Sequence, residues 1–196
     1  MYSHLEQNRL ISNRQHGFVK GRSCLTNLIE FFEELTRKID QDKAVDVVYM
    51  DFSKAFDKVP HGRLIQKVKS YGIRGELVRW VQNWLGHRKQ RVAVEEYFSN
   101  WRSVTSSVPQ GSVLGPLLFV IYIYINNLKE NVGSLISTFA DDTKIGGVGD
   151  SGEDCQRIHQ DINRLKTWAE RWRMEFNLDK CEVMQFGRCL LQKESI

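Results

Sequence analysis

Proline, long apolar runs and internal repeats are all scarce in this sequence. Only three of the 196 residues are proline, so long linkers between domains are not expected. The longest apolar run, Leu117–Ile125, is well short of the roughly 20 residues that a membrane-spanning helix needs. A chain of this length suits a single domain with one hydrophobic core, and we predict no membrane span.

Cysteine is also sparse, and its spacing excludes two classes of small protein. The four cysteines are Cys24, Cys155, Cys181 and Cys189. They form no CxxC pair and have no histidine nearby at ligand spacing, so neither a zinc site nor a disulfide framework is indicated. The polar N-terminal stretch MYSHLEQNRL does not have the pattern of a signal peptide. We therefore expect a protein of a reducing compartment that is not secreted.

Positive charge is concentrated in one stretch, although the net charge is only +4. Between His61 and Arg91 a single acid, Glu76, accompanies a series of basic residues. These are Arg63, Lys67, Lys69, Arg74, Arg79, Arg88, Lys89 and Arg91. Such a cluster can follow a phosphate backbone, or it can be the solvated face of surface helices. Charge alone leaves both interpretations open.

Helical and strand patterns are mixed along the chain. Apolar residues at helical spacing predict helices at 25–40, after Pro60, around 77–85, after the PQG stretch at 109–111, and from about 153. Runs of β-branched and aromatic residues predict strands at 44–52, around 90–94 and 101–107, and at 181–187. Residues 134–148 resemble a β-hairpin with two aspartates near its turn. Because strands do not simply alternate with helices, the predicted fold class is α+β.

Three aspartates are the strongest chemical signal. Asp51 ends a strand that is expected to be buried, where a charge is costly unless it is paired or bound to a metal. If this strand lies beside the hairpin, Asp51 meets Asp141 and Asp142, and their repulsion favours a cation between them. Hard divalent ions such as Mg²⁺ prefer such oxygen ligands. The alternative is a solvated turn, because aspartate is common in exposed turns.

Several motifs in series then resemble one family. VVYMDFSKAFDKVPH (47–61), SVPQGSVLGPLLF (107–119) and TFADDTKIGG (138–147) are similar to the palm motifs of reverse transcriptases. The match is closest to the non-LTR, LINE-type and jockey-like retrotransposons. QHGFVKGRSC (15–24) and WRMEFNLDKCEVMQFG (172–187) extend the resemblance over almost the whole chain.

The resemblance implies catalytic roles for four residues. In this family the aspartates that match Asp51, Asp141 and Asp142 hold the catalytic metals, Mg²⁺ or Mn²⁺. Lys180 matches a lysine that lies near the triphosphate and protonates the departing pyrophosphate. The implied reaction is two-metal nucleotidyl transfer. The implied partners are an RNA template, a DNA primer and deoxynucleotide triphosphates.

Further positions are implied to contact substrate. Phe52 and Phe56 match the segment that contacts the incoming nucleotide, with Phe56 beneath the sugar, although helical spacing from Phe52 also fits a core aromatic. Gln110 and Gly111 match the loop that lies against template and nucleotide. The template and primer residues are Arg22, in a segment with Gly17, Phe18, Lys20 and Gly21, and Gly187, in the stretch that grips the primer end.

The fold implied by the resemblance is a polymerase palm with part of the fingers. We expect an antiparallel sheet with a catalytic hairpin and helices packed on one face. Residues 1–44 correspond to partial fingers, 45–187 mainly to palm with a fingers-like helical part at 61–91, and 188–196 to a tail, while the thumb is expected to be missing. A retroelement protein is expected in the nucleus, the cytoplasm or both.

The chain also departs from the family pattern. Val19 stands where arginine is common, and IYIYINNL (121–128) resembles a duplication of Ile123–Tyr124 with Asn127 in place of aspartate. Two residues inserted in a helix rotate the rest of that helix by about 200°. These departures predict a remnant with intact carboxylates and impaired polymerase activity in isolation.

Two alternative functions are consistent with these departures. The first is a non-catalytic RNA- or DNA-binding module derived from such an enzyme. The second is another palm-fold enzyme that uses two metals, such as a nucleotide cyclase. The Pro-Gln-Gly loop and Phe56 disfavour a cyclase, because a cyclase has no template to position.

Overall fold

The chain folds as two compact units in the computed structural model, which describes residues 1–124 and 132–187. The first unit comprises residues 1–11 and 54–125, and the second comprises residues 12–53 and 126–196. The first is mainly helical, and the second is built on a sheet. The assignment of segments to fingers, palm and tail stays a prediction.

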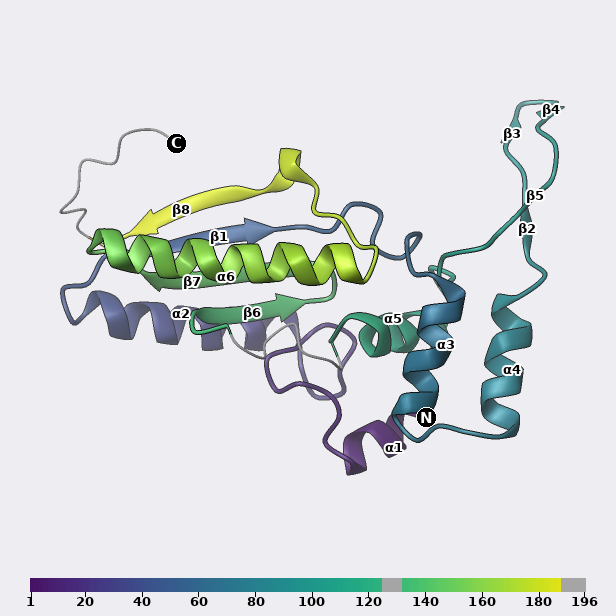
Figure 1. Cartoon of the computed structure of the whole chain (residues 1–196), viewed down its shortest axis with the longest axis horizontal. Coiled ribbons are helices and arrows are strands. Elements are labelled where there is room, and N and C mark those ends of the chain that lie inside the picture. The colour runs from purple at the N-terminus through teal and green to yellow at the C-terminus, as the bar shows by residue number, and fades with distance from the viewer. Residues whose placement is uncertain (125–131, 188–196) are drawn as a thin grey trace. The chain divides into compact units, whose positions relative to one another are not determined.

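The second unit contains a four-stranded antiparallel sheet in the order β6-β7-β1-β8 (Figure 1). Its strands are β1 (Val45–Met50), β6 (Leu135–Phe139), β7 (Asp142–Val148) and β8 (Glu182–Phe186). Its helices are α2 (Cys24–Ile39), α6 (Gly152–Arg171) and the short 3-10 helix η1 (Leu178–Lys180). Because β1 has a neighbour on each side, its apolar sequence is that of a central strand. The predicted strands at 44–52 and 181–187 and the predicted hairpin are confirmed.

Helices cover both faces of this sheet. On one face, Phe31 of α2 packs with Val47 of β1. On the other face, Ile158 of α6 lies so close to Gly147 that a Cβ on this glycine would be 2.7 Å from it. The neighbouring Gly146 faces Phe31 instead. The prediction that helices pack on one face is therefore wrong in this detail, because two consecutive glycines let helices approach β7 from both sides.

Both long helices of this unit begin at a serine that satisfies their first amides. The Ser23 hydroxyl accepts a hydrogen bond from the Thr26 amide (3.2 Å), and the Thr26 hydroxyl accepts one from the Ser23 amide (2.9 Å). Ser151 accepts from the Asp154 amide at 3.2 Å in the same way. These caps explain why α2 and α6 start where they do.

The first unit is formed by helices and a projecting pair of short ribbons. Its helices are α1 (Tyr2–Gln7), α3 (His61–Ser70), α4 (Glu76–Leu85) and α5 (Leu114–Tyr124). Its strands are β2 (Lys89–Gln90), β3 (Ala93–Val94), β4 (Tyr97–Phe98) and β5 (Arg102–Ser103). Helix α3 packs against α4 and α5, and Leu64, Val81 and Phe119 are buried there. Asn127 lies outside the described residues, and α5 is helical up to Tyr124.

Lys67 of α3 departs from the sequence-based interpretation of its stretch as a basic surface. Its side chain is buried, and its ammonium donates a hydrogen bond to the Tyr122 carbonyl in α5. Burial lowers the pKa of Lys67 from 10.5 to about 7. Lys67 is therefore part of the packing between α3 and α5 and is not available to a phosphate backbone.

The lowered pKa predicts that this unit becomes more stable as the pH rises above 7. Between pH 7 and 10.5 the unfolded chain keeps Lys67 protonated while the folded chain releases the proton. Since the unfolded state then binds more protons, the free energy of unfolding increases with pH. Relative to Lys67→Met, the natural chain should gain about 2 kcal/mol between pH 7 and about pH 9. Urea unfolding at both pH values measures this gain, and parallel pH profiles for the two proteins would contradict it.

The described part of the chain, residues 1–124 and 132–187, contains no helix with the length and apolar character needed to cross a membrane.

Candidate active site

Asp51 lies directly after β1, at the end of the sheet where the hairpin turns. Its carbonyl accepts a hydrogen bond from the Asn177 amide at 2.8 Å, which fixes the backbone beside η1. Its carboxylate is mostly buried, with 15% of the side chain exposed, and its Oδ2 lies 2.7 Å from the Nζ of Lys180. Lys180 comes from the end of η1, 129 residues further along the chain. The structure thus pairs two residues that the family motifs single out separately.

The hairpin of β6 and β7 brings the other two aspartates to the same end. Phe139 pairs with Asp142, so Ala140 and Asp141 form the turn between them. Ala140 has a φ of 53°, a backbone conformation that is strained for a residue with a side chain. Such strain persists only where surrounding structure holds it. The tip that carries Asp141 and Asp142 is therefore held in a defined conformation.

The charges of these four residues shift the pKa values of their neighbours at the site. Burial raises the pKa of Asp141, and the charge of Asp51 raises it further. Burial also raises the pKa of Asp142, with added contributions from Asp141 and Asp51. The hydrogen bond to Asp51 raises the pKa of Lys180, and all three aspartates add to this effect. The three aspartates thus lie at the same end of the sheet, with the Lys180 ammonium at Asp51, and their joint role at a metal stays a prediction.

A hollow of about 450 Å³ opens beside these residues. Asp51, Asp142 and Lys180 line it together with Tyr49, Lys144 and Glu182. Lys144 donates to the Asn27 side chain at 3.4 Å and lies over the rings of Phe31 and Tyr49. The hollow therefore combines carboxylates, two cations and an aromatic wall, which suits a charged ligand that also carries a flat group.

The carboxylate oxygens at this end of the sheet are ligands of the kind that a hard divalent cation prefers. At Asp51 the Lys180 ammonium already lies where such a cation would bind. Across residues 1–124 and 132–187, however, no three side chains among His, Cys, Asp and Glu close around a single point as a metal cage would. A cation at Asp51 would therefore need Lys180 to turn away and the hairpin tip to adjust.

Gly17 has a structural role that the sequence did not reveal. Residues 14–16 run along the free edge of β6: the His16 amide donates to the Thr138 carbonyl (3.1 Å), and the Thr138 amide donates to the Arg14 carbonyl (3.2 Å). A Cβ on Gly17 would lie only 2.2 Å from the backbone nitrogen of Ala140. The glycine therefore allows this loop to lie directly against the strained turn.

Gly17→Ala is expected to destabilise the second unit by about 1–3 kcal/mol, because backbone cannot give way to the new methyl group. The matched control is Gly62→Ala in α3, where a Cβ would meet nothing within 4 Å. This control should be neutral or more stable by up to about 1 kcal/mol. Thermal unfolding of the two variants measures the difference, and equal stability would show that the close contact has no energetic weight.

His16 and Arg22 hold the same loop. The His16 ring lies 3.0 Å from the Thr26 hydroxyl and 2.8 Å from a Glu30 carboxylate oxygen, both in α2. The Arg22 guanidinium donates to the carbonyls of Ser12, Asn13 and Gln15 at 2.5–2.9 Å. Arg22 thus organises the loop in this structure, and its contact with template stays a prediction.

Gly187 lies far from the aspartates. Phe186 pairs with Val45 at the start of β1, whereas Asp51 follows the end of that strand. Six residues of strand separate the two positions by roughly 20 Å. Gly187 has a φ of 86°, and a Cβ on it would lie 2.8 Å from the Lys43 carbonyl. The positive φ and the close carbonyl explain why glycine stands at this position, so a role at the primer end stays a prediction.

The Phe52 side chain points into the core, and a nucleotide contact by this residue stays a prediction. Phe52 is 2% exposed, stacks on Phe176 with ring centroids 4.5 Å apart and lies 6.2 Å from the ring of Trp168. Because side chains alternate along an extended segment, Asp51 faces the hollow and Phe52 faces the core under α6. Trp168 is buried as well, as its helical spacing predicts.

The remaining predicted substrate residues belong to the first unit. Phe56 is half-buried and stacks on Phe119, with ring centroids 4.2 Å apart. Gln110 and Gly111 are exposed in the loop before α5, and Gly111 has a φ of 74° that favours glycine. Their loop is tight, because a Cβ on Gly115 would lie 2.3 Å from the Pro109 carbonyl. Their roles toward nucleotide and template stay predictions.

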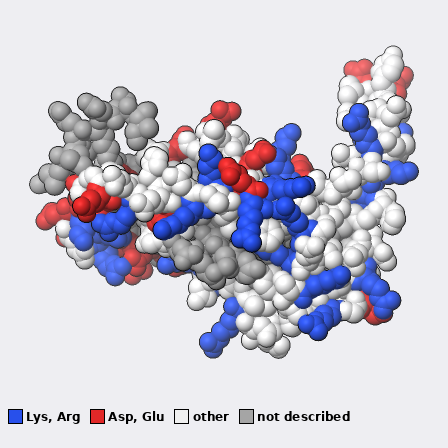
Figure 2. Space-filling model, viewed as in Figure 1, with Lys and Arg blue, Asp and Glu red and all other residues white. Residues whose placement is uncertain are grey.

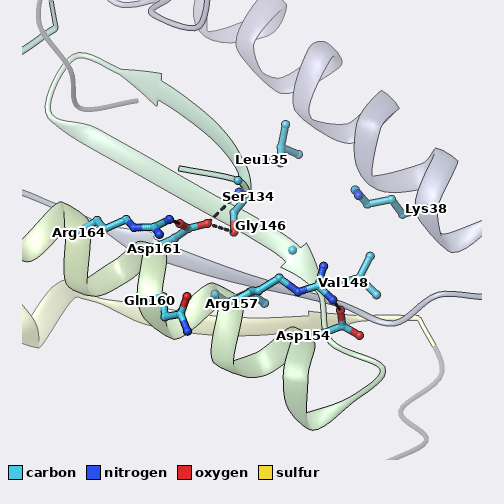
Figure 3. Close-up of a pocket in the computed structure, with 13 residues that line it drawn as sticks. Lys38, Ser134, Leu135, Gly146, Val148, Asp154, Arg157, Gln160, Asp161 and Arg164 are labelled. Atoms are coloured by element: carbon cyan, nitrogen blue, oxygen red, sulfur yellow. Dashed lines mark hydrogen bonds and ion pairs between the residues drawn. The ribbon is translucent and has the colours of Figure 1, made fainter. Parts of the chain in front are cut away.

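A second hollow of the second unit lies near the start of β6 (Figure 3). There the buried Asp161 accepts hydrogen bonds from the Ser134 amide (2.9 Å) and hydroxyl (2.7 Å) and pairs with Arg164 at 2.7 Å. Arg157 pairs with Asp154 one turn of α6 away. The hydrogen bonds of Asp161 to Ser134 tie α6 to the residue before β6, which is a structural role.

Comparison with known proteins relates the chain to one family. The protein-family model described as "Reverse transcriptase (RNA-dependent DNA polymerase)" matches residues 1–195 of the chain. The probable RNA-directed DNA polymerase from transposon BS of Drosophila melanogaster is 26% identical over 189 residues, covering 90% of this chain and 20% of that protein. The polymerase from mobile element jockey of the same organism is 30% identical over 147 residues, covering 71% and 16%. The chain thus spans about a fifth of the length of these relatives.

Solved telomerase structures share the fold. Telomerase from Candida albicans in complex with a fragment of telomeric RNA matches 93% of this chain and 34% of its own, with a TM-score of 0.67 and 11% identity. A truncated apo telomerase from Candida tropicalis matches 99% and 40%, with a TM-score of 0.64 and 10% identity. At such identity the likeness concerns the fold, and it agrees with the predicted α+β class.

Proposed function

Because this chain belongs to the reverse transcriptase family, we propose that it carries the polymerising centre of an RNA-directed DNA polymerase of a non-LTR retrotransposon. The observation that supports this most is the position of Asp51, Asp141, Asp142 and Lys180 at one end of the sheet. The substrates would be deoxynucleotide triphosphates, a DNA primer and an RNA template.

Reverse transcriptases generally use divalent metal ions. Here Asp51, Asp141 and Asp142 would hold Mg²⁺ or Mn²⁺, since carboxylate oxygens are the ligands these ions prefer. When bound, two such ions activate the primer 3′-hydroxyl and neutralise charge on the pyrophosphate. The position of the aspartates on two adjacent strand ends would fix them with little conformational freedom.

Lys180 would serve the triphosphate. In the reaction the primer 3′-oxygen forms a bond to the α-phosphorus, the bond to the pyrophosphate oxygen breaks, and the hydroxyl proton passes to water. A lysine ammonium is charged near neutral pH, as a group that neutralises or protonates the pyrophosphate must be. The side chain of Lys180 is 65% exposed, so it can turn from Asp51 toward a phosphate.

Phe56, Gln110 and Gly111 would complete the substrate contacts. A half-buried aromatic stacked on Phe119 offers a firm surface beneath a sugar. Gly111 lets the backbone come close to template and nucleotide. These assignments rest on the family motif and on the local geometry of each residue within its own unit.

The alternative is a nucleic-acid-binding module without catalysis. The observation that favours it is the pairing of Asp51 with Lys180, which satisfies the carboxylate without a metal. In that case the chain would bind RNA but form no new phosphodiester bond.

Template-directed extension of a primer on RNA, with Mg²⁺ or Mn²⁺ and over a series of salt concentrations, tests the proposal. Extension by the natural chain that is lost in Asp141→Ala would support it. Products whose length is independent of the template would indicate a different palm-fold enzyme, such as a cyclase. If neither protein extends the primer while both bind RNA, the non-catalytic alternative replaces the proposal.

A further inference from the structure

A two-stranded arm of the first unit exposes aromatic and basic side chains together. We call residues 88–104 the hairpin arm: β2 pairs with β5, β3 pairs with β4, and Glu95–Glu96 form its tip. Every residue from 89 to 103 is exposed. An isolated ribbon of this kind is only marginally stable in water, and exposed aromatic clusters usually mark a contact surface.

On one face of the hairpin arm, a cationic side chain lies against two aromatic rings. The Arg91 guanidinium lies 4.0 Å from the centroid of the Phe98 ring and 4.7 Å from that of Trp101. Phe98 and Trp101 are 56% and 59% exposed. Tyr97, which neighbours Phe98 and therefore points to the opposite face, is 80% exposed. The arm thus has one face with a cation between aromatic rings and another with a single tyrosine.

The charge of the hairpin arm indicates which partner fits this face. Figure 2 shows Lys and Arg side chains below the tip of the arm and acidic side chains at the tip. The basic residues of the arm are Arg88, Lys89, Arg91 and Arg102, and the strand pairing places Glu95 and Glu96 at the turn. Arg88 donates to the carbonyl of Ser107 at 3.1 Å, which anchors the base of the arm. A lower half with cations and rings complements a phosphate backbone with exposed bases, whereas the acidic tip does not.

We propose that the hairpin arm binds single-stranded nucleic acid, with bases stacked on Phe98 and Trp101 and phosphates neutralised by Lys89, Arg91 and Arg102. Base stacking on aromatic rings combined with a positive surface is how proteins bind single strands without sequence preference. Arginine adds an attraction to the ring faces that keeps cation and rings together. This inference deepens the proposed function by naming a surface that would hold template or primer outside the catalytic end.

Binding of a labelled oligouridylate to the full chain, followed by fluorescence anisotropy without nucleotides or divalent ions, tests the inference. Phe98→Ala combined with Trp101→Ala should weaken binding at least about tenfold. Arg91→Gln should weaken it and reduce the salt slope by roughly one unit. The matched control is Tyr97→Ala, which removes an exposed ring from the opposite face of the same arm and should leave the affinity unchanged.

The outcomes separate this inference from the proposed function. Wild-type affinity in the double variant, or an equal loss in Tyr97→Ala, would overturn the inference. A double variant that binds RNA normally but loses self-association in sedimentation would assign the arm to protein contact and overturn it as well. Asp141→Ala should lose primer extension but keep RNA binding by the arm. RNA binding by the arm can therefore be tested even if the natural chain extends no primer. Circular dichroism establishes that the variants fold.

Discussion

Asp51→Asn is expected to lower primer extension by at least about 10³-fold, which corresponds to roughly 4 kcal/mol of lost transition-state stabilisation. Asp51 is the carboxylate with the most defined surroundings at the site, since its backbone is tied to Asn177 and its side chain is mostly buried. Asparagine keeps the shape but removes the charge that a divalent ion requires. Single-turnover extension at saturating nucleotide measures the effect on the bond-forming step.

A second readout of Asp51→Asn does not depend on activity. The charge of Asp51 contributes to the raised pKa of both Asp141 and Asp142, so both pKa values should fall in the variant. Carboxyl carbon NMR titration without divalent ions measures this. The control is Asp179→Asn, an exposed carboxylate next to Lys180, which should keep extension. Full activity in Asp51→Asn would remove this residue from the reaction.

Phe52→Ala is expected to lower the free energy of unfolding by about 3–5 kcal/mol, the usual cost of removing a buried aromatic ring. The ring of Phe52 lies between Phe176 and Trp168, under α6. Its loss would leave a cavity directly behind Asp51. Urea unfolding followed by far-UV circular dichroism measures the cost.

Phe52→Leu separates packing from substrate contact. Leucine fills part of the cavity, so its cost should be well below that of alanine. If Phe52 contacted nucleotide instead, both variants would keep the stability of the natural chain and raise the KM for nucleotide. A double-mutant cycle with Phe176→Ala should show a coupling energy of about 0.5–3 kcal/mol, as expected for residues in contact.

The elements that carry Asp51, Asp141 and Asp142 could be predicted from the sequence alone. β1 is a continuous β-branched and aromatic run, and the hairpin has apolar residues on either side of an Asp-Asp turn, so both have strong local signals. Their meeting in space required the family resemblance. Register and sheet order depend on contacts between segments about ninety residues apart, which no local pattern encodes.

Burial is what the sequence does not reveal at two positions. Lys67 belongs to a basic stretch and Phe52 to a family motif, because charge and motif position are visible in a sequence, yet both side chains are buried. Lys67 lies one residue before the buried Val68 on α3, so helical spacing leaves its direction ambiguous. The face to which Phe52 points is shown by its contacts with Phe176 and Trp168, which only the structure reveals.

The contact of Gly17 is likewise not visible in the sequence. A loop with glycines and cations predicts a turn that is free to meet nucleic acid, and the sequence has no sign that it lies against Ala140. The close contact becomes visible only when two distant residues are considered together. Gly17 has no room for a Cβ, and Ala140, 123 residues later, has a positive φ.

The loop at residues 14–16 also bears on solubility. β6 is the outer strand of its sheet, and an outer strand with free amides and carbonyls is a template for pairing with another chain. The two backbone hydrogen bonds to Thr138 block that edge near the hairpin end of the strand. Variants that loosen this loop should therefore aggregate more readily, even where the aspartates keep their positions.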